Sequence, residues 1–274
     1  MRDKTVSSSL RYKFAENLIS EAGQMALSYF YDLSQLIIEK KGHQDLVSQA
    51  DKNVEIFIRE HISVQFPDDG IIGEEGGISV KTDSTDSGYK WVIDPIDGTA
   101  NFVSGIPAWV VVIALVKDNS VIAGFIFDPV LNELYTATAG EGAFCNGNPL
   151  SVSGAKNLHD GSVAVGFSNR SKAGFINKLV GHIVDNGGVF YRNASGALSL
   201  AYVAAGKLTG YSEDHMNAWD YLAGQLMVKE AGGYIEEQNI ADVLINGGRV
   251  IASTPAIFSQ LVAFTENALK PDPD

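Results

Sequence analysis

Cysteines, long apolar runs and a signal sequence are scarce or missing in this chain. Cys145 is the single cysteine among 274 residues, so no internal disulfide can form. The longest apolar run, Ala108 to Val116, is far too short to span a bilayer as a helix. The segment from Met1 to Leu10 lacks the apolar core of a signal peptide. These absences predict a cytoplasmic protein that has no contact with a membrane.

Basic residues are outnumbered by acidic ones. The chain has 20 Lys and Arg against 33 Asp and Glu, a formal net charge of −13. This charge repels nucleic acid phosphates, and no run of basic residues is longer than Lys40-Lys41. We therefore expect no direct binding of nucleic acid. An acidic chain is compatible with binding of metal cations.

Several common catalytic motifs are absent from the sequence. There is no Gly-x-x-x-x-Gly-Lys phosphate loop, and the five His residues form no His-x-x-x-His pair. Cys145 has no neighbouring His or Asp to activate its thiol. The fragment Gly140-Glu141-Gly142 lacks a third glycine and a following helix, which argues against a dinucleotide site.

The stretch from Trp91 to Phe102 carries the clearest chemical signal. Its first residues, Trp91 to Ile93, are typical of a short buried strand. Because Pro95 has no amide hydrogen for a sheet ladder, the strand is predicted to end at Asp94. Asp94 and Asp97 then flank one turn of backbone.

A short helix is predicted to begin directly after these acids. Gly98 supplies conformational freedom, and a helix that starts at Thr99 would leave its first amides free to hold an anion. Mg²⁺ prefers a few carboxylates together with substrate phosphate oxygens. The pattern therefore indicates divalent cations held against a phosphate. The alternative is a capped helix, because Asp and Thr are common capping residues.

More acidic residues stand at predicted strand ends and helix starts. Glu74 and Glu75 follow the short strand Ile71–Gly73, while Asp51 and Asp220 fall in the first turns of two helices. Pairing with the helix dipole could explain Asp51 and Asp220, and exposure to solvent could explain the Glu pair. If these acids converge, they raise one another's pKa, and bound Mg²⁺ removes that penalty. Two metals about 3.5–4 Å apart would then activate a water and stabilise the leaving oxygen.

Apolar periodicity divides the chain into two halves. An amphipathic helix is predicted over about Arg11 to Tyr31, and the runs Trp109–Lys117 and Val121–Phe127 form an antiparallel hairpin. Beyond Pro149, strands and helices alternate, which implies a partly parallel sheet. We expect an α+β half at 1–147 with most of the metal ligands. An α/β half at 148–274 would carry Asp220 and the residues that select the substrate.

Three separated motifs resemble those of the inositol monophosphatase family. They are Glu74-Glu75 after a glycine, Trp91 to Thr99 with Asn101-Phe102, and Trp219-Asp220 followed by Ala223-Gly224 and Glu230 to Gly233. The resemblance implies a mixed α/β fold, a layered αβαβα sandwich of the inositol monophosphatase and fructose-1,6-bisphosphatase type, commonly dimeric. It also implies hydrolysis of phosphate monoesters with Mg²⁺, often inhibited by Li⁺.

The resemblance also implies roles for the acidic residues. Glu74, Asp94 and the Ile96 carbonyl would hold one Mg²⁺, and Asp94, Asp97 and Asp220 a second. Glu74 would also help to bind a weaker third ion and orient the attacking water. Glu75 would support these ligands without binding metal itself.

Thr99 is implied to activate the attacking water while paired with Asp51, and the Gly98 and Thr99 amides would receive the phosphate. On the alcohol side of the substrate, the family pattern indicates four residues: Asp97, Ser195, Gly196 and Glu213. Two local departures bear on substrate choice. The family often has Gly-Ser/Thr-Ala where this chain has Ala194-Ser195-Gly196, and Asn217-Ala218 precedes Trp219.

The leading hypothesis is therefore a Mg²⁺-dependent phosphatase, in a homodimer, that converts myo-inositol monophosphate to inositol and phosphate. Histidinol-phosphate, sugar-bisphosphate and nucleotide 3′-phosphate phosphatases remain alternatives with the same chemistry. A different class is also open, because some bacterial members of the family associate with the transcription or RNA machinery.

Overall fold

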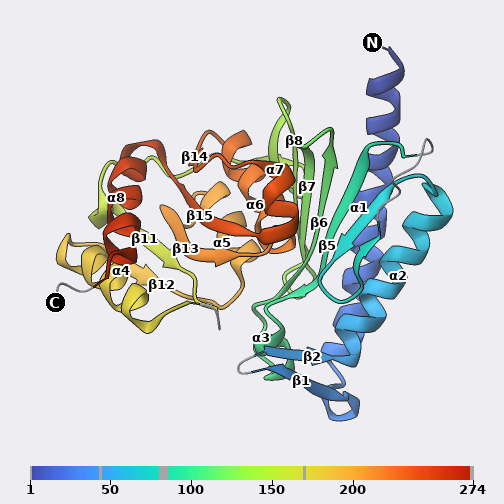
Figure 1. The fold of residues 1–274 in the computed structure, drawn as a ribbon, viewed down its shortest axis with the longest axis horizontal. Coiled ribbons are helices and arrows are strands. Elements are labelled where there is room, and N and C mark those ends of the chain that lie inside the picture. The colour runs from blue at the N-terminus through green and yellow to red at the C-terminus, as the bar shows by residue number, and fades with distance from the viewer. Residues whose placement is uncertain (1, 43–44, 80–85, 169–170, 272–274) are drawn as a thin grey trace.

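The computed structural model describes residues 2–42, 45–79, 86–168 and 171–271. Helices and sheets alternate across the molecule in five layers (Figure 1). From right to left in that view they are helices α1 and α2, a large sheet, helices α5 and α6, a smaller sheet, and helices α4 and α8. The predicted αβαβα sandwich is confirmed.

The large sheet forms the core of the N-terminal half. Within the described residues it has eight strands in the order β10-β9-β8-β7-β6-β5-β3-β4. Only the pair β3 and β5 is parallel among them. In chain order the strands are β3 (Gly70–Gly73), β4 (Gly77–Ser79), β5 (Tyr89–Asp97), β6 (Val110–Lys117), β7 (Ser120–Asp128), β8 (Glu133–Thr138), β9 (Gly142–Cys145) and β10 (Asn148–Pro149).

Two long helices cover one face of this sheet. Helix α1 (Arg2–Phe30) packs on β6 and β7, and α2 (Gln49–Gln65) packs on β5. Apolar residues at steps of three and four along α1 bury against the sheet, among them Leu18, Ala22 and Ala26. The predicted helix over Arg11 to Tyr31 is confirmed, although α1 begins nine residues earlier, at Arg2. Nearby lie the hairpin of β1 (Ile38–Gly42) and β2 (Asp45–Ser48), and the 3-10 turn η1 (Leu33–Gln35).

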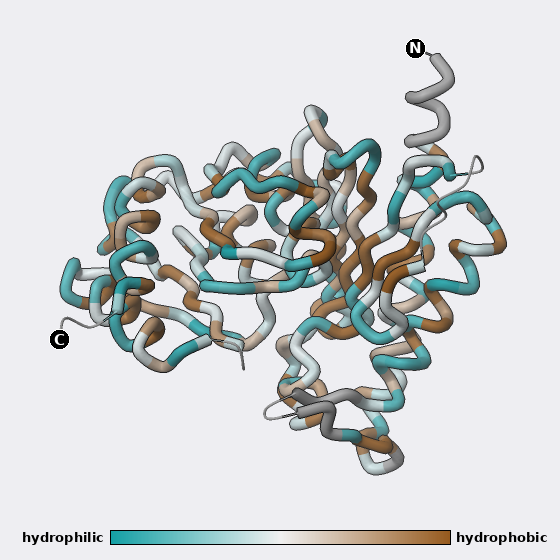
Figure 2. Tube along the Cα trace, in the orientation of Figure 1, coloured by the Kyte–Doolittle hydropathy of each residue, from teal (hydrophilic) through white to brown (hydrophobic). Residues whose placement is uncertain are grey.

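Helices α5 (Gly196–Ala204) and α6 (Ala218–Glu230) lie between the two sheets. Both are buried on nearly every side, as expected for helices with a sheet on each face. The approach is close where α6 crosses β7, because a Cβ on Gly124 would lie 2.8 Å from the Ala223 backbone. One apolar core therefore joins strands of both sheets to these helices. The brown, hydrophobic segments of Figure 2 concentrate in the strands of the large sheet.

The smaller sheet belongs to the C-terminal half. Its strand order among the described residues is β12-β11-β13-β15-β14, and β11 pairs parallel with both β12 and β13. The strands are β11 (Ser162–Val165), β12 (Val189–Tyr191), β13 (Gly210–Met216), β14 (Tyr234–Ile235) and β15 (Gly248–Ser253). The outer helices are α4 (Ala173–Asp185) and α8 (Phe258–Leu269), with α7 (Ile240–Asn246) beside α6 and the turns η2 (Leu158–Asp160) and η3 (Pro255–Ile257).

The predicted partly parallel sheet after Pro149 is confirmed by these pairings. The boundary at 147 and 148 stays a prediction about the two halves. Strand β10, which begins at Asn148, completes the edge of the large sheet. No helix in the described part of the chain is long and apolar enough to cross a membrane.

The end of strand β5 differs from the sequence prediction. The strand was expected to stop at Asp94 and instead continues to Asp97. Its pairing with β6 is regular up to Asp94, shifts register, and resumes at Asp97. Pro95 therefore lies at an irregularity of the ladder, where its missing amide hydrogen costs no regular sheet bond.

Candidate active site

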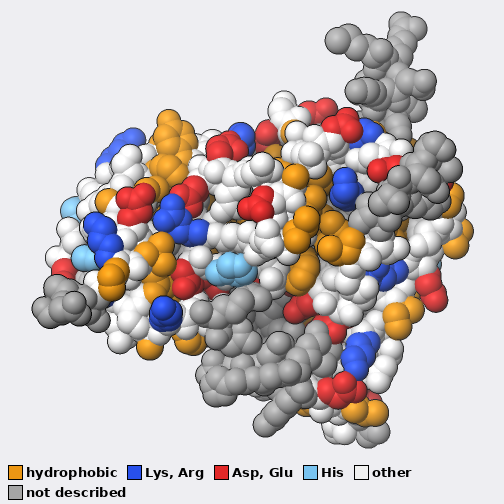
Figure 3. Space-filling model, in the orientation of Figure 1, with side chains coloured by type: hydrophobic (Ala, Val, Ile, Leu, Met, Phe, Trp, Pro, Cys, Tyr) orange, Lys and Arg blue, Asp and Glu red, His pale blue; other side chains and the backbone are white. Residues whose placement is uncertain are grey.

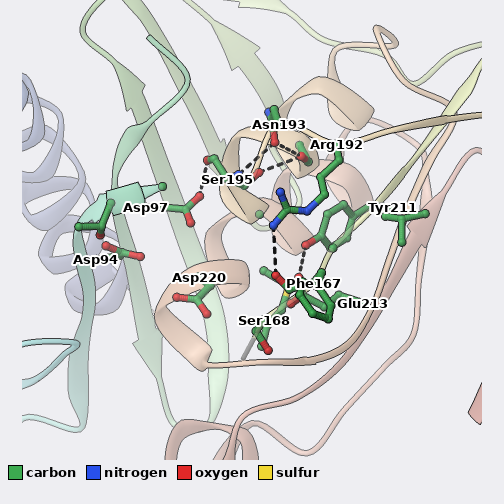
Figure 4. Close-up of a pocket in the computed structure, with 18 of the residues that line it drawn as sticks. Asp94, Asp97, Phe167, Ser168, Arg192, Asn193, Ser195, Tyr211, Glu213 and Asp220 are labelled. Atoms are coloured by element: carbon green, nitrogen blue, oxygen red, sulfur yellow. Dashed lines mark hydrogen bonds between the residues drawn. The ribbon is translucent and has the colours of Figure 1, made fainter. Parts of the chain in front are cut away.

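A cleft of about 170 Å³ lies between one end of the large sheet and residues of the smaller sheet and of helices α5 and α6. Its N-terminal wall consists of Glu74, Asp94, Ile96, Asp97, Gly98 and Thr99. Its C-terminal wall consists of Val165 to Ser168, Arg192 to Gly196, Ser199, Tyr211, Glu213, Met216 and Asp220. Figure 4 shows Asp94, Asp97 and Asp220 directed into the space between these walls. Acids separated by up to 146 positions in the sequence, Glu74 to Asp220, thus share one cleft.

Asp94 lies at the irregularity of strand β5 and is 1% exposed. The Ile96 amide donates a hydrogen bond to Asp94 Oδ1 at 3.0 Å, which fixes the carboxylate against its own loop. Burial, followed by the charges of Glu74, Asp97 and Asp220, raises the pKa of Asp94 well above its usual value. A positive charge in the cleft would relieve this repulsion.

Asp97 joins the N-terminal wall to helix α5. Its Oδ2 accepts hydrogen bonds from Ser195 Oγ at 2.5 Å and from the Ala197 amide at 2.8 Å. Burial raises the pKa of Asp97 to about 6, while the bonds from Ser195 and the first amides of α5 lower it. The carboxylate therefore stabilises the start of a helix in the other half and still lines the cleft.

Gly98 and Thr99 form the start of the short helix α3 (Thr99–Val103). Gly98 has a φ of 98°, and a Cβ there would lie 2.9 Å from the Ala108 carbonyl oxygen, so this turn requires glycine. Thr99 Oγ1 lies 3.1 Å from Asp51 Oδ1 and 3.0 Å from the Ile96 carbonyl oxygen. The predicted contact between Thr99 and Asp51 is present.

Asp51 also caps its own helix. Its Oδ2 accepts bonds from the Ser48 amide at 2.8 Å and the Ser48 hydroxyl at 2.6 Å, which completes a capping box at the start of α2. The structural and the functional interpretation of Asp51 therefore both apply, each through a different carboxylate oxygen.

Glu74 and Glu75 occupy the turn between β3 and β4. The Glu74 amide donates to the Ile93 carbonyl at 3.3 Å, which extends the parallel pairing of β3 and β5 by one residue. Glu74 lines the cleft, whereas Glu75 is not among the lining residues. The two adjacent acids are therefore separated by the turn that carries them, and only Glu74 lines the cleft.

Asp220 lies in the first turn of α6, as predicted. The Asn217 amide donates to Asp220 Oδ2 at 3.0 Å within a capping box, and the helix begins at Ala218. Helix capping thus accounts for one oxygen of Asp220, while the side chain lines the cleft opposite Asp94 (Figure 4).

The predicted alcohol-binding residues all lie on the cleft. Glu213 is buried on β13, and Tyr211 Oη donates to its Oε2 at 2.5 Å. Burial, with smaller contributions from Asp220 and Asp214, raises the pKa of Glu213 to about 8 against the opposing bond from Tyr211. Gly196 is closely covered, because a Cβ there would lie 2.2 Å from Met216 Cε. The Met216 side chain thus fills space that an alanine at position 196 would need.

Several cleft residues were missed by sequence reasoning, including Phe167, Arg192, Asn193 and Met216. Phe167 and Arg192 follow the parallel strands β11 and β12, and Arg192 Nη2 lies 3.4 Å from the Phe167 carbonyl oxygen. The carboxyl ends of neighbouring parallel strands are where open α/β folds bind ligands, so this rule could have identified both. Met216 gave no such signal, because a methionine in a strand is ordinary core.

The donor set of the cleft fits Mg²⁺ by its chemistry. The lining carboxylates and the Ile96 carbonyl supply the hard oxygen ligands that this cation prefers. Among the described residues, however, no three His, Cys, Asp or Glu side chains form a group that could hold a metal ion. An ion shared by Asp94, Asp97 and Asp220 would therefore require these side chains to move closer together when it binds, with waters and substrate phosphate as its other ligands.

Comparison with known proteins finds similar sequences and similar structures. The family model of the inositol monophosphatase family matches residues 8–269. An inositol-1-monophosphatase of Mesorhizobium japonicum is 35% identical over 252 residues, covering 91% of this chain and 93% of the relative. The Nus factor SuhB of Escherichia coli is 36% identical over 247 residues, covering 89% and 91%. The crystal structure of the extragenic suppressor protein suhB from Bartonella henselae superposes with a TM-score of 0.86 at 33% identity, covering 96% and 100%.

Proposed function

Since this chain belongs to the inositol monophosphatase family, we propose that it is a Mg²⁺-dependent phosphatase that hydrolyses myo-inositol monophosphate to inositol and phosphate. One observation carries the proposal: Glu74, Asp94, Asp97 and Asp220, which come from separate segments, line the same cleft. The raised pKa of Asp94 supports a cation there, because its first causes are burial and the neighbouring carboxylates.

The N-terminal wall would bind the metal and the phosphate. Glu74, Asp94 and the Ile96 carbonyl would hold one ion, and Asp94, Asp97 and Asp220 a second, with a weaker third ion near Glu74. Two or three Mg²⁺ ions would supply charge neutralisation and would lower the pKa of a water, which could then lose a proton as it attacks phosphorus. Because the carboxylates of the described residues do not lie close enough together to hold a metal ion, their side chains would have to move toward the ions on binding. The Gly98 and Thr99 amides, at the start of α3, would receive phosphate oxygens.

Thr99 and Asp51 would orient the attacking water. Asp51 Oδ1 accepts the hydroxyl hydrogen of Thr99, which leaves the Thr99 oxygen able to accept a hydrogen bond from water. Asp51 is itself fixed by Ser48, so this acceptor stays in place for the Thr99 hydroxyl. Phosphoryl transfer depends on such positioning and on charge neutralisation more than on a protein nucleophile.

The C-terminal wall would bind the alcohol half of the substrate. With a pKa of about 8, the Glu213 carboxyl is mostly protonated at neutral pH and can both donate and accept hydrogen bonds to hydroxyl groups. Ser195, Gly196 and Asp97 lie beside it on the same cleft. A polyhydroxylated ring such as inositol matches this set of donors and acceptors.

Arg192 favours a second candidate substrate class. It is the one Lys or Arg among the described residues that line the cleft, and its side chain is exposed. A guanidinium at this position could pair with a second phosphate, as a sugar bisphosphate would present. Histidinol phosphate and nucleotide 3′-phosphates remain candidates of the same chemistry.

Phosphate release from a panel of these esters tests the proposal. We expect the highest kcat/KM with inositol-1-phosphate, dependence on Mg²⁺ and inhibition by Li⁺. A preference for a bisphosphate that disappears in Arg192→Gln would favour the second class instead. Absence of Mg²⁺-dependent release from every ester would contradict a phosphatase.

We also propose that the protein forms a homodimer and that it binds a protein of the transcription machinery. The Escherichia coli relative is named a Nus factor, which supports a protein partner in transcription. Acidic and basic side chains are interspersed on the face shown in Figure 3, and the net charge is −13, so a protein contact fits better than direct RNA binding. Light scattering tests the dimer, and copurification with RNA polymerase tests the partner.

A further inference from the structure

We propose that Glu55 and Arg59 of helix α2 are positioning residues that hold the Glu74 turn in the geometry that binds metal. This inference rests on the proposed function, in which Glu74 is a metal ligand. Neither residue lines the cleft. Both would act through the backbone of the turn that follows β3.

Glu55 binds the backbone of this turn with both carboxylate oxygens. The Glu75 amide donates to Glu55 Oε2 at 2.7 Å, and the Gly76 amide donates to Glu55 Oε1 at 2.8 Å. Glu55 is only 1% exposed, so its carboxylate is shielded from water, although the turn residues that it binds lie closer to the surface. Bonds from amides to a buried carboxylate are stronger than bonds between neutral groups. The two amides directly after Glu74 are thus fixed to α2.

Arg59 completes the network from the next turn of the helix. Its Nε donates to Glu55 Oε1 at 2.6 Å, and its Nη2 donates to the Gly77 carbonyl at 2.5 Å. The guanidinium thereby compensates the buried charge of Glu55 and binds the far side of the same turn. Three successive residues of the turn, from Glu75 to Gly77, are bonded to this pair.

The glycines of the turn make this close approach possible. A Cβ on Gly73 would lie 2.3 Å from Glu55 Oε1, and one on Gly76 would lie 2.6 Å from Arg59 Nε. Both distances are far below contact distance. The chain therefore has no side chain at the two places where the Glu55 and Arg59 side chains approach the backbone.

Helix α2 connects two parts of the proposed machinery. Asp51, Glu55 and Arg59 follow one another at steps of four and share one face of the helix. Asp51 binds Thr99, while Glu55 binds the turn that carries Glu74. The helix thus sets the position of the water-orienting hydroxyl relative to the metal ligand.

Glu55→Gln tests this proposal while keeping the size of the side chain. A glutamine offers one oxygen, so its NH₂ group would face one of the two amide donors and that amide loses its acceptor. We expect Mg²⁺ affinity, measured by calorimetry with Mg²⁺ alone, to fall about 10-fold. Hydrogen exchange at the Glu75 and Gly76 amides should accelerate at least about 10-fold.

The matched control is Glu60→Gln, which removes the same charge from an exposed position of the same helix. It should change neither measurement. In phosphate release, Glu55→Gln should raise the Mg²⁺ concentration needed for half activity more than it lowers kcat at saturating Mg²⁺. Equal loss in both variants, or unchanged Mg²⁺ affinity and exchange in Glu55→Gln, would overturn the proposal.

Arg59→Gln provides a second test if Glu55→Gln fails to fold, because Arg59 is partly exposed. It removes the bond to Gly77 and leaves Glu55 in place, so we expect a smaller fall in Mg²⁺ affinity, about 3-fold. No fall would contradict the role of Arg59. Calorimetry and hydrogen exchange need no substrate. A protein that binds Mg²⁺ but releases no phosphate would therefore contradict the proposed function without contradicting the role of Glu55 and Arg59.

Discussion

The two walls of the cleft are built in different ways. Five of the six residues of the N-terminal wall fall within the short segment from Asp94 to Thr99, which is held by strand β5 and helix α3. The C-terminal wall draws its residues from five places, at the end of β11, after β12, in the first turns of α5, along β13 and at the start of α6. One wall is therefore set by local sequence, and the other by the packing of distant elements.

This difference matches the division of labour between the walls. Binding of metal and phosphate needs fixed charges at close range, which a short motif on a strand end provides. Recognition of the alcohol depends on the shape of a surface, which single side chains such as Met216 beside Gly196 determine. Substitutions in the N-terminal wall should therefore change the rate for every substrate, whereas substitutions in the C-terminal wall should change stability, pH dependence or substrate choice.

Asp94→Asn should have the largest effect. It removes a carboxylate assigned to both metal sites, and loss of several kcal/mol of transition-state stabilisation corresponds to at least about 10³-fold in kcat. The fold should persist, because a neutral side chain relieves the repulsion that raises the pKa of Asp94. Phosphate release measures the loss of kcat, and circular dichroism measures whether the fold persists. The control is Asp118→Asn on the exposed β6–β7 turn, and Mg²⁺-dependent activity that stays unchanged in Asp94→Asn would remove the metal assignment.

Thr99→Ala should lower kcat by about 10²-fold, the usual range for loss of a group that handles the water proton. The hydroxyl is fixed between Asp51 and the Ile96 carbonyl, so no neighbouring group can replace it. Thr99→Ser keeps the hydroxyl and should retain most of the activity. If both variants are equally slow, the Thr99 methyl group and not its hydroxyl is what matters.

These two predictions concern residues that sequence reasoning found, since the acids and Thr99 lie in compact motifs. The predicted end of β5 was wrong by three residues, because a proline at a register shift leaves the strand intact. Glu55 was missed for another reason. A Glu followed four residues later by an Arg on a helix is typical of an exposed ion pair, and only the packing of the β3–β4 turn shows that Glu55 is buried. Met216 was missed because no local pattern separates a cleft residue from a core residue.

Glu213→Gln should change how the free energy of unfolding depends on pH. This effect comes from a residue of the C-terminal wall. The folded-state pKa of about 8 lies above the ordinary value of a glutamate, 4.5. Between these two pH values the folded state keeps a proton that the unfolded chain has lost, so the free energy of unfolding falls as pH rises. A glutamine cannot titrate, and its Oε1 can still accept the bond from Tyr211.

The variant should therefore gain stability over the wild type as pH rises from about 4.5 to 8, by roughly a few kcal/mol, with no further gain above pH 8. Urea unfolding of both proteins across this range, in the presence of a chelator, measures the difference. Glu237→Gln, at an exposed carboxylate, is the control and should follow the wild type. A pH-independent difference would mean that Glu213 titrates normally.

Ala194→Gly should have the smallest effect, and it tests whether the departure of the C-terminal wall from the family pattern is strained. Ala194 has a φ of 63°, in the left-handed region, which costs an alanine about 1 kcal/mol relative to glycine. Glycine also loses more freedom on folding, which offsets roughly half of that gain, so we expect stabilisation of about 0.5 kcal/mol. Ala205→Gly, at the end of α5 with a negative φ, should destabilise instead. The turn at Ala194 presents Ser195 to Asp97. An altered ranking of substrates in Ala194→Gly would therefore show that the backbone strain shapes the alcohol site. A change in stability without a change in ranking would show that the strain affects only the stability of the fold.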